Sequence, residues 1–204
     1  MRDQGPTATS APPTCFPGFL SAGECRDLVA EIDAAHQERA KIWTGEAFGV
    51  DPGSRLGSIA ALTPDGERLV HERLYGVIAQ LEQRFACEVS HLTAITALVY
   101  GPGDHFAAHS DGGYDDEAPS EVRRRRVSLV VALNDGARDF SGGELHFYPG
   151  CAPPDAASAG PEHIIRVRSE PGLLVAFASP MTHQVMPVIA GRRYSLALWA
   201  LAPE

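Results

Sequence analysis

The sequence has few of the residues that would staple a small fold or hold a structural zinc ion. Its four cysteines, among 204 residues, lie far apart and form no Cys-x-x-Cys pair. Neither a zinc knuckle nor a dense disulfide framework is therefore indicated. We interpret the cysteines as reduced thiols, because a chain of this length buries enough surface to form a core without such staples.

Long apolar runs and excess positive charge are also missing. The N-terminus lacks the apolar centre of a signal peptide, and no stretch approaches the roughly 18 apolar residues of a membrane-spanning helix. The chain has 17 Lys and Arg against 26 Asp and Glu, for a formal net charge of -9. Because phosphate backbones are bound by clustered cations, we expect no nucleic-acid partner. The sequence predicts a cytoplasmic protein, monomeric or homodimeric, without a membrane partner.

Glycine and proline, in contrast, are abundant. The 20 Gly and 16 Pro favour many short strands joined by turns over a helical bundle. Residues 1–14, rich in proline and small polar side chains, are expected to form a flexible tail. A single domain is predicted over residues 15–204, with helical support at 20–90 and a β core at 91–202.

Two helices are expected before the β region. Ser21 with Glu24 three residues later is a capping signature, and apolar residues then recur at helical spacing to about residue 36. The second helix follows Thr63, with an apolar face that runs over five turns to Phe85.

From residue 91 the apolar period shifts toward two and β-branched residues dominate. The strand candidates are residues 92–100, 127–133, 143–148, 163–167, 172–177 and 193–199. Helices followed by strands predict a mainly β fold with bracing helices, of the α+β class, whose core is a sandwich or jelly roll.

The clearest candidate for chemistry is a His-x-Asp pair with a distant histidine. In extended backbone, residues i and i+2 point to the same side, so His109 and Asp111 can meet at one point. His183, at the far end of the β region, is the candidate third ligand. Two histidines and one carboxylate are the ligands of non-haem Fe(II) oxygenases and leave positions open, whereas a structural zinc site closes with four ligands.

His-x-Asp alone arises easily by chance, so its assignment depends on the residues that accompany it. Arg193 lies ten residues after His183, with Ser195 on the same side of a predicted strand. An arginine fork matches a carboxylate with two hydrogen bonds. Arg192 points to the opposite side and is expected to be solvated.

Several blocks together resemble the iron and 2-oxoglutarate-dependent dioxygenase superfamily, most closely the catalytic domain of prolyl 4-hydroxylases. They are YGPGDHFAAHSD at 100–111, VSLVVALN at 127–134, SGGEL at 141–145, PGLLVAF at 171–177, HQVMPV at 183–188 and GRRYSL at 191–196. The resemblance implies a double-stranded β-helix, or jelly roll, that binds Fe(II) and uses 2-oxoglutarate and O2 as co-substrates.

The resemblance also assigns roles to individual residues. The three iron ligands are His109, Asp111 and His183. Arg193 is the ion-pair partner of the distal 2-oxoglutarate carboxylate, and three further residues match positions that contact this carboxylate or complete the Arg-x-Ser pattern: Tyr100, Ser128 and Ser195. The family often has threonine in place of Ser128 and commonly has lysine in place of Arg193.

The segment 112–126 falls where the family places loops that cover the substrate. Mixed charge in such a segment ordinarily belongs to a solvated loop. We hypothesise instead that one arginine of the run 123–126 meets a substrate carboxylate and that two aromatic side chains help to close the lid. The candidate substrate contacts are Trp43, Tyr114, Arg125 and Arg126.

The predicted activity is hydroxylation of an unactivated C–H bond of a small molecule, such as an amino acid or biosynthetic intermediate, with release of succinate and CO2. A short chain without a peptide-binding domain favours the small substrate, and a peptidyl or prolyl hydroxylase is the alternative. A non-catalytic jelly-roll metal-binding or sensor module is disfavoured, because a pure binder needs no open iron site with an anion clamp. The net charge of -9 disfavours a nucleic-acid demethylase.

Overall fold

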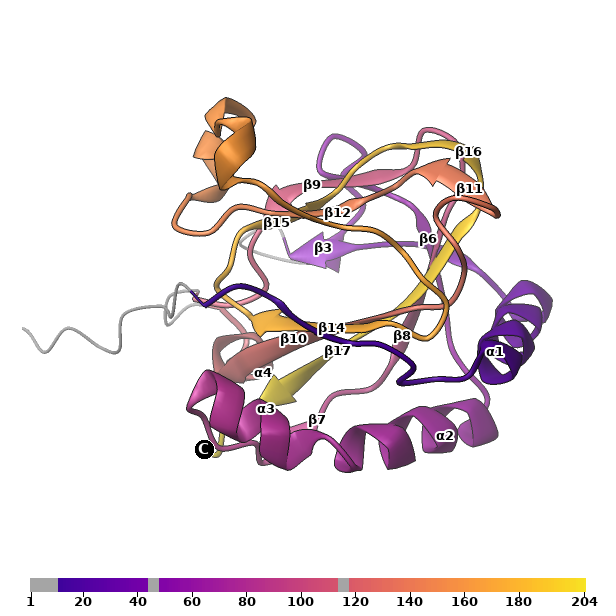
Figure 1. Ribbon diagram of the computed structural model, residues 1–204, viewed down its shortest axis with the longest axis horizontal. Helices are drawn as coiled ribbons and strands as arrows, with labels where there is room; N and C mark the ends of the chain where they lie inside the picture. The colour runs from indigo at the N-terminus through magenta and orange to yellow at the C-terminus, as the bar shows by residue number, and fades with distance from the viewer. Residues whose placement is uncertain (1–10, 44–47, 114–117) are drawn as a thin grey trace, which may run out of the picture.

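Two antiparallel sheets face one another in the computed structural model, which describes residues 11–43, 48–113 and 118–204. Helices α2 and α3 lie along the outer face of the larger sheet, and α1 lies at one end (Figure 1). This is the mainly β architecture with bracing helices that the sequence predicts. None of the described helices is long and apolar enough to cross a lipid bilayer.

The larger sheet has the strand order β1-β14-β10-β17-β8-β6-β2, and β7 pairs with β17. Its strands are β1 (Thr14–Phe16), β2 (Glu38–Arg39), β6 (Ser58–Ala60), β7 (His91–Leu92), β8 (Thr96–Tyr100), β10 (Arg125–Ala132), β14 (Leu174–Ala178) and β17 (Arg193–Leu201). Because side chains alternate along a strand, Leu196 and Leu198 of β17 pack toward the helices, whereas Arg193 and Ser195 point between the sheets.

The smaller sheet has the strand order β13-β12-β15-β9-β5. Its strands are β5 (Arg55–Leu56), β9 (His105–His109), β12 (Leu145–Phe147), β13 (Ile165–Val167) and β15 (His183–Val185). Two further pairs join β3 (Ile42–Trp43) to β4 (Phe48–Gly49) and β11 (Phe140–Gly142) to β16 (Val188–Gly191).

All six predicted strand regions contain strands, although the first is interrupted. Residues 92–100 were expected to form one strand, whereas residues 93–95 separate β7 from β8. Both strands still pair with β17. Pairing with β17 therefore keeps β7 and β8 in the same sheet on both sides of the interruption.

Helix α1 (Ala22–Ala34) begins at Ser21 with the predicted capping box: the Ser21 hydroxyl accepts from Glu24 N, and Glu24 Oε2 accepts from Ser21 N. The second predicted helix is instead two helices, α2 (Pro64–Tyr75) and α3 (Ile78–Phe85). The break follows from the pair Gly76 and Val77, since glycine and β-branched residues are weak helix formers. Short helices also occur at α4 (Ser120–Arg124), η1 (Pro153–Ser158) and η2 (Pro161–His163).

The core between the helices and the larger sheet is continuous. Val70 and Leu74 of α2 and Leu81 of α3 are fully buried against the outward side chains of the sheet. At the N-terminus, β1 starts at Thr14, the last residue of the predicted tail, and pairs with β14. Residues 1–10 of that tail lie outside the described residues.

Candidate active site

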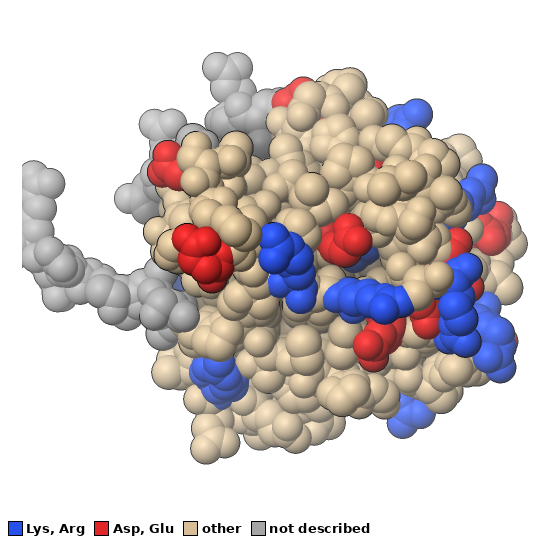
Figure 2. Space-filling model, turned by 45° about the horizontal axis from the view of Figure 1, so that its top comes forward, with Lys and Arg blue, Asp and Glu red and all other residues tan. Residues whose placement is uncertain are grey.

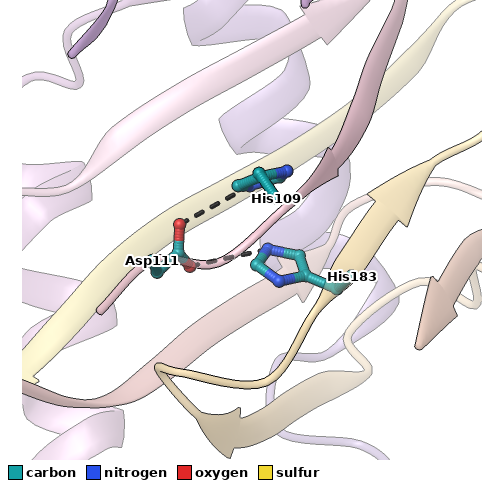
Figure 3. Close-up of side chains that lie close together, drawn as sticks. All are labelled: His109, Asp111 and His183. Atoms are coloured by element: carbon teal, nitrogen blue, oxygen red, sulfur yellow. Dashed lines mark ion pairs between the residues drawn. The ribbon is translucent and has the colours of Figure 1, made fainter. Parts of the chain in front are cut away.

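Three side chains from the smaller sheet converge on one point (Figure 3). His109 ends β9, Asp111 follows two residues later, and His183 begins β15 directly opposite His109 in the antiparallel register. The Asp111 carboxylate lies between the two imidazoles, with Oδ1 3.6 Å from His109 Nε2 and Oδ2 3.5 Å from His183 Nε2. The three ligand atoms lie within 4.8 Å of one another. Two ligand atoms that are each about 2.1 Å from one ion lie at most about 4.2 Å apart, so the separations of 3.6 and 3.5 Å suit a shared ion.

Both histidines present Nε2 to this point because their other ring nitrogen is engaged. Nδ1 of His109 lies 2.8 Å from the carbonyl oxygen of Ala107, and Nδ1 of His183 lies 3.0 Å from that of Met181. A carbonyl oxygen only accepts, so each Nδ1 carries the proton and each Nε2 keeps its lone pair. This is the tautomer that a metal ligand requires.

The electrostatics of the triad suit a divalent metal ion. Burial, followed by the nearby His109, lowers the pKa of His183 to about 4 against the opposing effect of Asp111, which keeps the ring neutral at pH 7. Burial by itself would raise the pKa of Asp111, but His183, His109 and a hydrogen bond from Ser128 together hold that pKa below its ordinary value. The result is an ionised Asp111 carboxylate beside a neutral His183 imidazole, which is the deprotonated state that metal binding needs of these two ligands.

Aromatic rings fix the planes of the two imidazoles. Phe106 stacks on His109 with ring centroids 3.5 Å apart and 14° between the planes. Phe177 meets His183 edge to face, with centroids 4.5 Å apart, and Phe147 packs on the same ring. Packing of this kind limits rotation of the ligands before a metal ion binds.

A cavity of about 220 Å³ extends from the triad between the two sheets to Arg193, and we call it the inner cavity. Arg193 and Tyr100 are direct register neighbours on β17 and β8. Arg193 is only 3% exposed, and one of its terminal nitrogens donates to the Ser195 hydroxyl at 2.7 Å. The structure thus brings Arg193, Ser195 and Tyr100 together, as expected from the sequence.

The inner cavity has the polar groups that a carboxylate would satisfy. Within the described part of the chain, Nε of Arg193 and the hydroxyl of Tyr100 are buried without a hydrogen-bond partner, and no Asp or Glu pairs with Arg193. Burial lowers the pKa of Arg193, an effect that Tyr100 opposes. A buried cation without an anion is costly, so this end of the cavity fits the distal carboxylate of 2-oxoglutarate.

Two glycines make room for these side chains. A Cβ at Gly143, where φ is +67°, would lie 3.1 Å from Cδ of Arg193. A Cβ at Gly57 would lie 3.0 Å from the Tyr100 ring. Larger residues at these positions would displace the side chains of Arg193 and Tyr100. Both glycines are therefore needed for the placement of these two side chains.

Ser128 lies elsewhere than the resemblance implies. Its hydroxyl donates to Asp111 Oδ2 at 2.7 Å and lies 3.1 Å from the Ser179 hydroxyl. In the β10–β17 register Ser128 stands opposite Trp199, whereas Ser195 stands opposite Ala132. Four residues of strand separate these positions by about 13 Å. Ser128 therefore supports the Asp111 carboxylate of the triad and does not reach the Arg193 end.

A second cavity of about 210 Å³ shares the triad side of the inner cavity, and we call it the outer cavity. It is lined by Lys41, Ile42, Ser54, Arg55, Phe106, Ala107, Ala108, His109, Ser110, Asp111, Val122, Arg125 and Trp199. The guanidinium of Arg125 lies 3.6 Å above the Trp199 ring, and its Nη2 lies 3.9 Å from Glu121. The predicted candidate Arg125 is thus at the cavity.

The other predicted substrate residues have different outcomes. Arg126 is exposed, lines neither cavity, and donates to the backbone oxygens of Arg123 and Arg125. It points away because adjacent residues of an extended segment face opposite sides. Trp43 belongs to β3, but its side chain lies outside the described part of the structure, as does all of Tyr114.

Sequence reasoning missed two cationic residues at the cavities, Arg55 and Lys41. Arg55 reaches the site because β5 pairs with β9, which places it opposite Phe106. Strand β5 has two residues, too few to show an alternating pattern. No local signal could have identified this arginine.

With this geometry established, comparisons with known proteins decide the family. A sequence model of the 2OG-Fe(II) oxygenase superfamily matches residues 95–201, more than half of the chain. The chain belongs to the 2OG-Fe(II) oxygenase superfamily. The family is named for 2-oxoglutarate and Fe(II), and the matched region holds all three residues of the triad.

One curated relative and several solved structures resemble this oxygenase. A PKHD-type hydroxylase of Sphingopyxis alaskensis is 33% identical over 94 residues, which cover 46% of this chain and 37% of the relative. The match thus spans well under half of that protein. A Pseudomonas putida prolyl-4-hydroxylase has a TM-score of 0.68 at 22% identity, covering 94% of this chain and 93% of its own.

A second solved structure extends the likeness in fold. A Trichoplax adhaerens prolyl hydroxylase, in complex with a hypoxia inducible factor oxygen degradation domain peptide fragment, has a TM-score of 0.70 at 18% identity. The match covers 95% of this chain and 84% of that one. At these identities the structures support the jelly-roll fold, and the substrate remains a separate question.

Proposed function

We propose that this oxygenase hydroxylates an unactivated C–H bond of a small molecule, such as an amino acid or biosynthetic intermediate. One atom of O2 enters the substrate as a hydroxyl group and the other enters succinate, while 2-oxoglutarate loses CO2. The observation that carries this proposal is the inner cavity, which joins the triad to a buried arginine that has no anionic partner among the described residues.

The residues of the chain would hold and orient the reactants. His109, Asp111 and His183 would hold Fe(II), which when bound supplies O2 activation for C–H oxidation. Arg193, assisted by Ser195, would anchor the distal carboxylate of 2-oxoglutarate at the end of the inner cavity. The anchor positions the co-substrate before reaction, which lowers the entropic cost of bringing the reactants together.

Apolar side chains would protect the reacting groups from water. Phe106, Val130 and Trp199 line the inner cavity, as expected for residues that surround a reactive oxidant. Phe147 packs on the ring of His183 instead of lining this cavity. Exclusion of water favours transfer of the hydroxyl group to the substrate over side reactions.

The outer cavity has room for a small substrate. Its volume of about 210 Å³ suits an amino acid or one side chain of a peptide. The second candidate is a peptidyl or prolyl hydroxylase, favoured by the fold shared with a prolyl hydroxylase in complex with a peptide fragment. A nucleic-acid substrate is disfavoured, since basic and acidic side chains are interspersed on the face in Figure 2 and the net charge is -9.

Succinate formation tests the proposal. Purified protein with Fe(II), 2-oxoglutarate and O2 should form succinate, and Asp111→Ala should abolish it because the triad loses its only carboxylate. The control Asp27→Ala replaces an exposed helix carboxylate and should retain the activity. Equal background consumption of 2-oxoglutarate by the wild type and Asp111→Ala would contradict an enzymatic role.

A substrate screen distinguishes the two candidates. Free amino acids and short peptides are compared for the succinate that each releases above the uncoupled rate. The proposal expects stimulation by a free amino acid or similar small molecule together with a hydroxylated product detected by mass spectrometry. Stimulation by peptides alone would support the peptidyl hydroxylase.

A further inference from the structure

Among the described residues, the lining of the outer cavity carries more positive than negative charge. Lys41, Arg55 and Arg125 line it, and the single acidic side chain that the described residues place there is Asp111, which belongs to the triad. Arg125 has Glu121 as an ion-pair neighbour. The excess therefore comes chiefly from Lys41 and Arg55.

Arg55 is held in place without an anion. Its guanidinium lies 4.6 Å from the centroid of the Phe106 ring, and Phe106 in turn stacks on His109. Nε of Arg55 is buried without a hydrogen-bond partner, and within the described part of the chain no carboxylate forms an ion pair with it. The aromatic ring thus orients an arginine whose strongest kind of partner, a carboxylate, is not supplied by those residues.

Trp199 presents a second donor from the opposite sheet. Its indole nitrogen is buried and has no acceptor among residues 11–43, 48–113 and 118–204. An indole N–H can only donate, and Trp199 lines both cavities beneath Arg125. A buried donor without an acceptor is costly, so Arg55 and Trp199 together point to an acceptor carried by a ligand.

We propose that Arg55 and Trp199 bind a carboxylate of the primary substrate, so the substrate class is a carboxylate-bearing small molecule. This inference rests on the proposed function for the existence of a primary substrate. It adds a binding site apart from Arg193, which anchors the co-substrate. Arg55 forms the ion pair, Trp199 offers the neutral hydrogen bond, and Lys41 adds positive charge at the same cavity.

Indole NMR tests binding without turnover. The full-length protein is loaded with Zn(II) and N-oxalylglycine, which fill the metal and co-substrate sites with an inert pair, and its tryptophans are labelled with 15N. The chain has two tryptophans, so Trp43→Phe identifies the Trp199 indole signal. The probes are N-acetyl amino acids covering the common side chains, each paired with its primary amide. We expect at least one carboxylate to shift the Trp199 signal and its amide to bind about tenfold more weakly.

Matched variants test whether Arg55 causes the preference for the carboxylate over the amide. Arg55→Gln should weaken binding of the carboxylate probe about tenfold and remove the preference over the amide, while Arg55→Lys should keep part of both. Arg126→Gln replaces an exposed arginine outside the cavities and should bind like the wild type. The inference is overturned if no probe shifts the signal, if amides bind as well as acids, or if Arg55→Gln keeps the preference.

The result of this binding test can be distinguished from the result of the succinate test of the proposed function. A protein that forms succinate from 2-oxoglutarate but shows no carboxylate preference would refute this inference alone. A protein whose Arg55 binds carboxylates but which forms no succinate would refute the enzymatic proposal and leave an anion-binding site.

Discussion

The two ends of the active-site cavity are built from different kinds of structure. At the inner end, Arg193 and Tyr100 belong to strands of nine and five residues that pair in register within the larger sheet. At the outer end, Arg55 lies on a strand of two residues, and Lys41 precedes another of the same length. The inner end is therefore fixed by the core, whereas the outer end depends on short segments.

This difference matches the tasks we assign to the two ends. The family is named for its co-substrate 2-oxoglutarate, and we assign the carboxylate of this co-substrate to a side chain that the sheet holds in one place. A primary substrate differs between enzymes, and short segments can change without disturbing a sheet. The metal triad stands between the ends and is supported from both sheets, since Ser128 of β10 donates to Asp111.

The largest effect is expected when the positive charge of Arg193 is removed from the inner end. Arg193→Gln should raise the KM for 2-oxoglutarate roughly 100-fold, because a charged hydrogen bond contributes about 1.5–3 kcal/mol. Metal affinity should change little, since Arg193 does not contact the triad. Steady-state succinate formation and a metal titration measure both quantities.

Arg192→Gln is the matched control for that experiment. Arg192 adjoins Arg193 but has a side chain that is 62% exposed and pairs with Asp33 on the surface at 3.5 Å. Its replacement should leave the KM for 2-oxoglutarate unchanged. If both variants raise the KM equally, or neither does, the inner end is not the carboxylate site.

A smaller effect, on metal affinity, is expected from the replacement of Ser128, which lies beside the triad between the two ends. Ser128→Ala removes a hydrogen bond to Asp111 and should lower metal affinity about tenfold, as is common for residues that orient metal ligands. The KM for 2-oxoglutarate, measured at saturating Fe(II), should equal that of the wild type. A raised KM with unchanged metal affinity would instead return Ser128 to the role that the family resemblance implies.

Strands with a clear alternating pattern were predictable, and short ones were not. Strands β10 and β17 carry enough residues for their inward and outward faces to be read from the sequence. Strands β2 to β5 have two residues each, so their pairing is decided by neighbours distant in the chain. The break at Gly76 shows the same limit, because the apolar face continues from α2 into α3 while the backbone does not.

The same limit decides which residues of the candidate site could be predicted from the sequence. The i and i+2 rule placed His109 with Asp111 and Arg193 with Ser195, since each pair lies on one extended segment. For Ser128 the rule predicts the face of β10 but not the position along it, which depends on the register with β17. Arg55 has neither motif nor period, and only the pairing of β5 with β9 brings it to the cavity.

The smallest expected effect lies in the helical layer, away from both ends. Glu24 Oε1 accepts from Arg73 of α2 at 2.6 Å, and Oε2 accepts from the backbone N–H of Ser21 at 2.7 Å. The hydrogen bond from Arg73, followed by those from Ser21, lowers the pKa of Glu24 to about 2. A carboxylate with a lowered folded-state pKa stabilises the protein above its unfolded value near 4.5, and this contribution is lost as the pH falls toward 2.

Glu24→Gln should therefore lower Tm by about 2–4 °C at pH 7, as expected for a capping interaction of about 1 kcal/mol in a domain of this size. The difference from the wild type should shrink between pH 4.5 and pH 2, which thermal unfolding followed by circular dichroism can measure. Glu72→Gln, on an exposed side chain, is the control and should change stability by less than about 0.5 kcal/mol. Because α1 and α2 lie outside both cavities, the KM for 2-oxoglutarate should stay constant. A change in KM would show that the helical layer shapes the inner end, and a Tm difference independent of pH would exclude the Glu24 carboxylate as its cause.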